Sequence, residues 1–159
     1  MQKRVIETRV SVYSFDELPT GCQQLINAAK EQVSNAYAPY SGFHVGAAVL
    51  LENGEIFAGN NQENSAYPSS LCAERVAMFY ANARRPDVPA SAIAIAAFAK
   101  GRFVDEPVTP CGSCRQVLLE TEIRFNRNIK VLLYGEKEIY MIDSIKDLLP
   151  LSFGKSNLK

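Results

Sequence analysis

The run Ser91–Ala99 limits the fold of this 159-residue chain more than any other feature, because nearly all of its residues are apolar. Such a strand is typical of a sheet that is buried on both faces. The run therefore predicts a central sheet with helices on both sides. The length of the chain and its apolar content of 47% fit a single domain over residues 1–159 that folds without disulfides.

The remaining helices and strands follow from hydrophobic periodicity and from turn residues. Asn53-Gly54 lies between two apolar runs, which is a strong signal for a β-hairpin. Ser69 or Ser70 and, further on, Asp143 are expected to cap helices. The order αββαβαββ predicts an α/β fold, a three-layer αβα sandwich with a five-stranded mixed β-sheet. The expected helices span 15–33, 72–83, 109–123 and 143–150, and the expected strands span 44–51, 55–59, 91–99, 129–134 and 138–142.

Two cysteine groups, each at the expected start of a helix, carry the chemistry of the chain. Free amides at a helix N-terminus lower the pKa of a thiol, and thiolates are the form that binds zinc. Two residues separate Cys111 from Cys114, so both sulfurs can reach one tetrahedral ion, with Cys72 as the third ligand. Three protein ligands leave a fourth position for a water that zinc activates. Glu74, two residues after Cys72, is placed to carry protons as the catalytic residue.

Further residues around these groups leave alternatives open. Cys22 could complete a four-cysteine structural zinc site, although a buried core cysteine is the preferred interpretation. Three thiolates on one dication leave a net negative cluster, which weakens zinc as a Lewis acid. Arg75 is therefore expected to donate hydrogen bonds to the ligand sulfurs from outside the ligand set, and Arg115 is a second candidate for this role.

Charge and hydropathy exclude several classes of partner. The chain has 17 basic and 17 acidic residues and no basic stripe, which argues against a nucleic-acid partner. No stretch approaches the length of a membrane span, and the first residues lack the apolar core of a signal peptide, so we expect no membrane partner. The expected location is therefore the cytoplasm, where thiols stay reduced.

Five sequence segments match one known family in order and spacing, and together they are more specific than the zinc-binding cysteines alone. From about Tyr37 to Phe153, the sequence resembles the homotetrameric cytidine deaminases, which are zinc-dependent nucleoside deaminases. The resemblance implies one Zn²⁺ per subunit and hydrolytic deamination of cytidine and 2′-deoxycytidine in pyrimidine salvage, with release of ammonia. The matching segments are Tyr40–Ala48, Asn61–Tyr67, Cys72–Arg75, Pro110–Gln116 and Leu148–Gly154.

The resemblance also implies which residues bind the nucleoside. Phe43 would stack on the pyrimidine, a role that suits a flat apolar ring. Asn61 and Glu63 would hydrogen-bond the ribose hydroxyls, and backbone groups near Ala73 would help to fix the base. An amide beside a carboxylate suits a sugar diol and repels a phosphate, which favours a nucleoside over a nucleotide.

Other residues would act across subunits if the resemblance holds. Ser65 and Tyr67 correspond to positions that reach a neighbouring subunit's site, and Phe153 corresponds to an aromatic residue that closes over the substrate from another chain. Each active site of the homotetramer would then be shared. Residues 1–13 form an N-terminal extension relative to the family, with an added strand or an arm over a neighbour as its two expected forms.

Three rival functions fit parts of the pattern. A blasticidin S deaminase would keep the chemistry and change the substrate, but Asn61 and Glu63 favour a ribose. A deaminase that edits polynucleotides would be expected to carry a basic excess. A non-catalytic, zinc-stabilised interaction module would need four protein ligands and would leave no open position on the metal.

Overall fold

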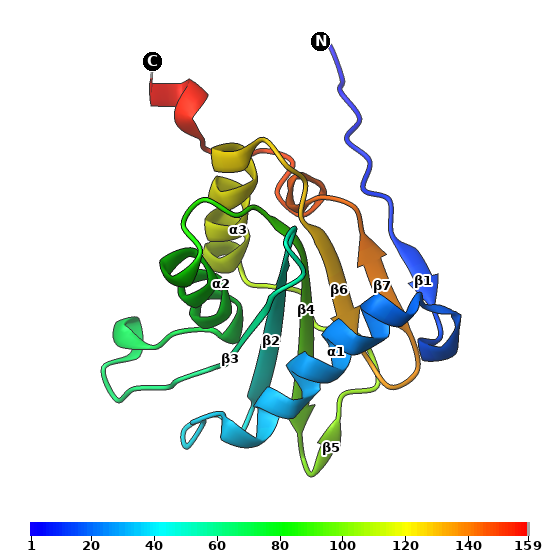
Figure 1. Ribbon diagram of the computed structural model, residues 1–159. Coiled ribbons are helices and arrows are strands. Elements are labelled where there is room, and N and C mark those ends of the chain that lie inside the picture. The colour runs from blue at the N-terminus through cyan, green and yellow to red at the C-terminus, as the bar shows by residue number, and fades with distance from the viewer. Residues whose placement is uncertain (159) are drawn as a thin grey trace.

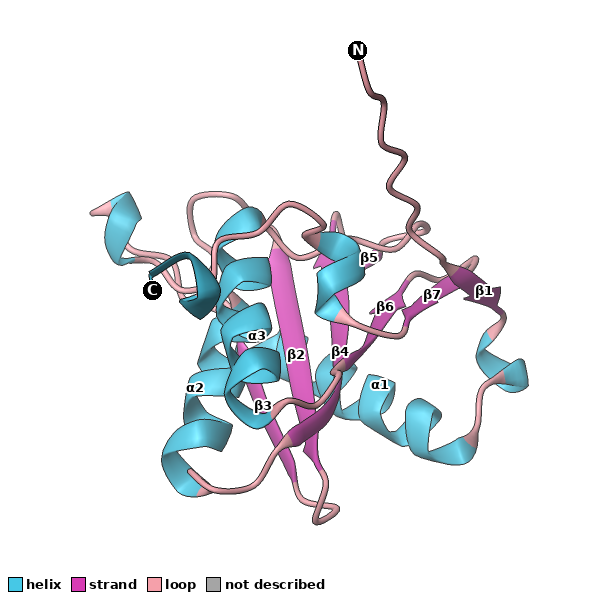
Figure 2. Ribbon diagram, turned by 90° about the horizontal axis from the view of Figure 1, so that it is seen from above, coloured by secondary structure: helices cyan, strands magenta, loops and turns pink. Residues whose placement is uncertain are grey.

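A computed structural model describes residues 1–158 and shows a mixed β-sheet between two layers of helices (Figure 1 and Figure 2). Helix α1 (Thr20–Gln32) covers one face, where it packs on strands β2 (His44–Leu51) and β4 (Ala90–Ala99). Helices α2 (Ala73–Arg84) and α3 (Gly112–Phe125) cover the other face and contact each other. The predicted three-layer αβα sandwich is therefore confirmed.

The sheet has seven strands rather than the predicted five. Six of them follow the order β1-β7-β6-β4-β2-β3, and β5 pairs with β4. Of the pairings, β4 with β6 is parallel and the others are antiparallel. The two strands missing from the prediction, β1 and β5, are only three and two residues long, too short for an alternating pattern to be recognised. The strands are β1 (Ser11–Tyr13), β2 (His44–Leu51), β3 (Ile56–Asn60), β4 (Ala90–Ala99), β5 (Arg102–Phe103), β6 (Lys130–Tyr134) and β7 (Ile139–Ile142).

Strand β4 lies in the middle of the sheet and is buried along most of its length, as its apolar sequence predicts. Ile93 and Ile95 pack with α2 and α3, whereas Ala92, Ala94 and Ala96 pack with α1. This difference follows from the alternation of side chains along a strand. Small side chains under α1 bring that helix close to the sheet.

The expected helix caps were wrong in detail. Cys72, rather than Ser69 or Ser70, is the N-cap of α2, because Tyr67–Ser69 form a separate 3-10 turn. Near the C-terminus, Ser144 rather than Asp143 is the cap, and it accepts a hydrogen bond from the Lys146 N–H at 3.2 Å. The element that follows is the 3-10 turn Ile145–Leu148 instead of a longer helix.

Two other helices also begin at residues that differ from the prediction. The first expected helix is divided, since a 3-10 turn at Phe15–Glu17 precedes Pro19, and α1 starts only at Thr20. The third helix starts at Gly112 rather than near Thr109 because Cys111 is its N-cap. Both shifts place a residue with non-helical backbone angles directly before the helix.

Part of the N-terminal extension forms an added strand, which is one of its two expected forms. Ser11–Tyr13 form an added edge strand, β1, which pairs antiparallel with β7. Residues 1–10 form no helix or strand and extend away from the sheet (Figure 1). Within residues 1–158, none of the helices is both long and apolar enough to cross a membrane.

Candidate metal centre and active site

Three cysteine sulfurs meet where α2 and α3 begin. Cys72 is the N-cap of α2, Cys111 is the N-cap of α3, and Cys114 lies in the first turn of α3. Their Sγ atoms all lie within 4.8 Å of one another. The Sγ of Cys111 is 3.9 Å from that of Cys72 and 3.5 Å from that of Cys114. The cluster forms because the two helices pack side by side with their N-termini at the same end.

Hydrogen bonds inside the cluster favour ionisation of one thiol. The pKa of Cys72 is lowered to about 5, first by a hydrogen bond from the Cys114 thiol and further by Arg75. The same bond, together with burial, raises the pKa of Cys114. Nη2 of Arg75 lies 3.8 Å from Cys72 Sγ and also donates to the Ser70 carbonyl at 3.3 Å. The structure therefore places Arg75 where it can offset negative charge on the sulfurs.

The donor set fits zinc. Three cysteines without a disulfide among them match a tetrahedral ion with one position left for a non-protein ligand. Cys22, the candidate fourth ligand, lies in α1 and packs with the residues on that helix's side of the sheet. It is therefore separated from the cluster by the sheet. Arg115, the second arginine candidate, donates to backbone carbonyls and to Thr109 instead of to sulfur.

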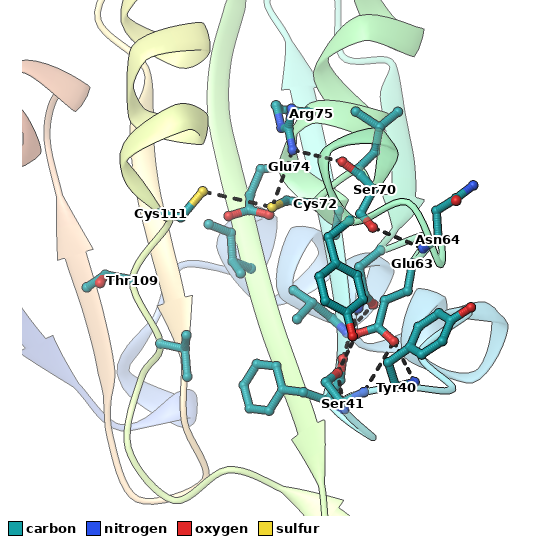
Figure 3. Close-up of a pocket in the computed structure, with 18 residues that line it drawn as sticks. Tyr40, Ser41, Glu63, Asn64, Ser70, Cys72, Glu74, Arg75, Thr109 and Cys111 are labelled. Atoms are coloured by element: carbon teal, nitrogen blue, oxygen red, sulfur yellow. Dashed lines mark hydrogen bonds between the residues drawn. The ribbon is translucent and has the colours of Figure 1, made fainter.

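Glu74 lies in the first turn of α2, with its side chain beside the cysteine cluster (Figure 3). Only 5% of the residue is exposed. Burial is the main cause that raises the pKa of its carboxyl group above the ordinary value. A buried carboxyl group with a raised pKa, next to a metal site, is suited to accept and return a proton.

A cavity of about 710 Å³ opens next to the cluster. Small-molecule sites commonly have volumes of about 300–1,000 Å³. The cavity therefore has room for a nucleoside. Its walls bring together most of the residues expected from the sequence, namely Phe43, Asn61, Glu63, Tyr67, Cys72, Ala73, Glu74, Arg75 and Cys111.

Asn61 and Glu63 are held by other parts of the cavity wall. The Asn61 amide accepts from the Val45 N–H at 2.8 Å and donates to the Phe43 carbonyl at 2.9 Å. Glu63 accepts from the Ser41 hydroxyl at 2.5 Å and from the Tyr40 N–H at 2.9 Å. The Ser41 hydrogen bond is the main cause that lowers the pKa of Glu63, which keeps it ionised. These bonds fix both side chains against the segment that carries Phe43, and Figure 3 shows Glu63 beside Ser41 and Tyr40.

Of the three residues expected to act across subunits, two lie apart from the other site residues and one lines the cavity. Ser65 and Phe153 are exposed and do not line the cavity of their own chain. Tyr67 lines the cavity but is 72% exposed, with its ring 6.0 Å from that of Tyr40. The Phe153 carbonyl accepts a hydrogen bond from Gln116 at 2.9 Å, which fastens the C-terminal segment to α3.

The sequence predicted no part in metal or substrate binding for several other residues of the cavity wall. Four of them, at positions 40, 41, 45 and 64, lie inside segments that carry the family resemblance, so the signal was present. For Val108 and Thr109, the only sign of a place in the site was their position directly before Pro110-Cys111. Ile95 gave no such sign, because it is one apolar residue in a buried strand. The unassigned wall residues are Tyr40, Ser41, Val45, Asn64, Ser70, Leu71, Ile95, Val108 and Thr109.

The sandwich fold, the three cysteines at two helix starts and the buried glutamate together define an α/β zinc-binding enzyme domain. The family model described as "Cytidine and deoxycytidylate deaminase zinc-binding region" matches residues 20–126. The chain belongs to this family, and its cofactor is one zinc ion, which confirms the prediction from the cysteine spacing.

Relatives with assigned names agree with the family. A cytidine deaminase from Sporosarcina psychrophila is 41% identical over 136 residues, which cover 86% of this chain and 93% of the relative. The crystal structure of a cytidine deaminase from Burkholderia pseudomallei has a TM-score of 0.70 and 40% identity, and the match covers 82% of this chain and 97% of that one. A Mycobacterium tuberculosis cytidine deaminase has a TM-score of 0.63 and 34% identity, with 82% and 95% of the two chains covered.

Proposed function

We propose that this chain catalyses the zinc-dependent hydrolytic deamination of cytidine and 2′-deoxycytidine to uridine and 2′-deoxyuridine, with release of ammonia. The observation that carries the proposal is the position of Glu74. Its buried carboxyl group lies beside three cysteine sulfurs at the wall of a cavity with room for a nucleoside. The relatives named cytidine deaminase are similar over most of the chain, which supports the same substrate class.

The reaction replaces the amino group at C4 of the pyrimidine by the oxygen of water. When held by Cys72, Cys111 and Cys114, zinc supplies the Lewis acidity that makes water nucleophilic near neutral pH. Glu74 takes one proton from the water and gives it to N3 of the ring, while the remaining hydroxide adds to C4. The same carboxylate then takes the proton of the new C4 hydroxyl group and gives it to the amine, so that the C4–N bond breaks, ammonia leaves and the C4 carbonyl forms. Arg75, which lies beside Cys72, offsets the charge of the thiolates.

Three wall residues hold the substrate in this proposal. Phe43 stacks on the pyrimidine face. Glu63 is kept ionised by Ser41 and retains lone pairs that can accept from ribose hydroxyls. Asn61, whose amide bonds the backbone on either side of His44, orients this wall and reaches the ribose from the same face as Glu63. Backbone groups at Ala73, the first residue of α2, orient the base.

We also propose a homotetramer in which sites are shared between subunits. The support is the exposure of Tyr67 and Phe153, which are 72% and 59% accessible in the isolated chain. Large aromatic residues with this exposure are typical of interfaces. Ser65 would contact the substrate site of a neighbour in the same way. The whole chain would act as one catalytic domain, and its reduced thiol cluster suits the cytoplasm.

Absorbance assays with purified protein test the activity. We expect cytidine and 2′-deoxycytidine to be converted, and a metal chelator to abolish conversion until zinc is restored. Glu74→Gln should retain zinc and lose about 10³-fold or more in kcat, the scale of general acid–base catalysis. The matched control is Glu120→Gln, an exposed position of α3, which should remain active. A Glu74→Gln enzyme of near-normal rate would contradict the proposed proton transfer.

The same assay separates the rival functions. Turnover of blasticidin S without turnover of cytidine would replace the proposed substrate, and turnover of single-stranded oligonucleotides would point to an editing enzyme. Light scattering should give the mass of four chains. Mixing subunits of Glu74→Gln with subunits of Phe153→Ala should restore part of the activity if each site takes Glu74 and Phe153 from different chains. No restoration in verified mixed tetramers would refute shared sites.

A further inference from the structure

Arg115 joins two segments that are distant in sequence. Its Nε donates to the Pro110 carbonyl at 2.7 Å, and its Nη2 donates to the Thr109 hydroxyl at 3.1 Å. Its Nη1 donates to the Leu148 carbonyl at 2.7 Å. One planar guanidinium thus bonds the loop before Cys111 on one side and the end of the 3-10 turn Ile145–Leu148 on the other.

The loop that Arg115 bonds at Thr109 and Pro110 is adjacent to the metal centre. Thr109 and Val108 form part of the cavity wall, and Cys111 is the exposed member of the cysteine cluster. Across the part of the chain that the structure describes, residues 107–110 make no hydrogen bonds other than those from Arg115. The Arg115 side chain therefore holds the loop on one side of Cys111, while on the other side the Cys111 carbonyl accepts from the Arg115 backbone N–H at 2.9 Å in the first turn of α3.

The other side of the contacts leads to the C-terminal segment. After Leu148 the chain continues through exposed residues to Phe153, whose carbonyl is held by Gln116. Arg115 and Gln116 are neighbours on α3, one turn after Cys111. Among residues 1–158, the Gln116 side chain donates a hydrogen bond only to the C-terminal segment, whereas the Arg115 side chain donates to both segments.

We propose that Arg115 is a positioning residue that fixes the loop of the zinc ligand Cys111 and the C-terminal segment of Phe153 relative to each other. Its effect on substrate binding rests on the proposed deaminase function, whereas its effect on the metal does not. Residues that hold metal ligands from outside the ligand set commonly change metal affinity or activity by about 10–100-fold when they are replaced.

Three variants separate this role from a general loss of stability. Arg115→Ala removes the contacts to both segments, and Gln116→Ala removes the C-terminal contact alone. Arg124→Ala is the matched control, because Arg124 also lies on α3 and donates to a backbone carbonyl, that of Pro86, far from the cysteine cluster. The measurements are the rate at which a chromogenic chelator removes zinc, the spectrum of the Co²⁺-substituted protein, and kcat and KM for cytidine.

We expect Arg115→Ala to lose zinc about tenfold faster, to change the Co²⁺ spectrum and to raise KM. Gln116→Ala should raise KM while its zinc loss stays normal, and Arg124→Ala should change neither quantity. A folded Arg115→Ala protein whose zinc loss, spectrum and KM all match those of Arg124→Ala would overturn the proposal.

A conservative variant keeps the test decisive if Arg115→Ala does not fold. Lys keeps the charge but cannot bond both segments with a planar fork, so Arg115→Lys should fall between the wild type and Arg115→Ala. Zinc loss and KM identical to those of the wild type in Arg115→Lys would overturn the proposal. If the wild type does not convert cytidine, the proposed function fails, whereas zinc loss and the Co²⁺ spectrum still decide the role of Arg115.

Discussion

Glu122 offers a prediction whose size can be worked out from individual contacts. It lies on α3 with 1% of its surface exposed. Its Oε1 accepts from the Ile129 N–H at 2.7 Å, from the Ile145 N–H at 2.9 Å and from the Ser144 hydroxyl, while Oε2 accepts from the same hydroxyl at 3.0 Å. One side chain thus ties α3 to the start of β6 and to the turn that precedes the C-terminal segment.

Glu122→Ala would leave the N–H groups of Ile129 and Ile145 buried without an acceptor. An unsatisfied buried donor costs about 1–3 kcal/mol, so two give about 2–6 kcal/mol. The Ala variant also no longer buries a carboxyl group, and the free energy saved in this way offsets part of the cost. We expect a net loss of about 3 kcal/mol in the free energy of unfolding. Glu122→Gln should lose about 1 kcal/mol or less, because its amide oxygen can replace Oε1 for both N–H groups.

Urea denaturation at one fixed protein concentration measures these differences, since the stability of an oligomer depends on concentration. The matched control is Glu120→Ala, an exposed position on the same helix, which should change stability little. The reasoning would be refuted if Glu122→Ala stayed within about 1 kcal/mol of this control, the cost of only one orphaned donor. It would also be refuted if the Gln and Ala variants were equally unstable.

Three further predictions concern packing, the metal and pH. A Cβ at Gly46 would lie 2.0 Å from the Ala29 carbonyl oxygen, so Gly46→Ala should displace α1 and destabilise the fold by about 3 kcal/mol. Gly21→Ala is the control, because a Cβ at Gly21 would meet open space, and this variant should not lose stability. The midpoints of urea denaturation compare the two variants. Cys22→Ala should leave the zinc content unchanged by elemental analysis, and loss of zinc would restore the four-cysteine alternative. Ser41→Ala removes the main cause of the lowered Glu63 pKa, so this pKa should rise. The acid limb of the KM–pH profile, where the Glu63 carboxylate is protonated as pH falls, should then move to higher pH. An unchanged acid limb would contradict this role of Ser41.

Local pattern was enough to predict the elements that form the frame of the site. The hairpin of β2 and β3 follows from Asn53-Gly54 between two apolar runs, and it forms with the antiparallel pairing expected. The burial of β4 follows from its composition. Caps were harder to place, because Ser69, Ser70 and Asp143 have the right chemistry for a cap and lie within a few residues of the actual helix starts.

Some members of the candidate site could be predicted because helix geometry fixes their spacing. Cys111 and Cys114 share one turn of α3, and Glu74 lies in the first turn after Cys72. The contacts of Arg115 were not predictable, since its expected partners were sulfurs and its actual partners include a carbonyl 33 residues away. No local pattern indicates which distant carbonyl needs a donor.

The sequence by itself determined the ligand types, the spacing of Cys111 and Cys114, the buried central strand and a glutamate two residues after a ligand. All of these depend on residues within a turn of a helix or along one strand. Only the tertiary structure decided that Cys72 meets a cysteine 39 residues away, that Cys22 lies across the sheet, and that Phe153 does not line the cavity of its own chain. The physical reason is that local spacing follows from backbone geometry, whereas long-range contact depends on which helices pack together and on which face of the sheet.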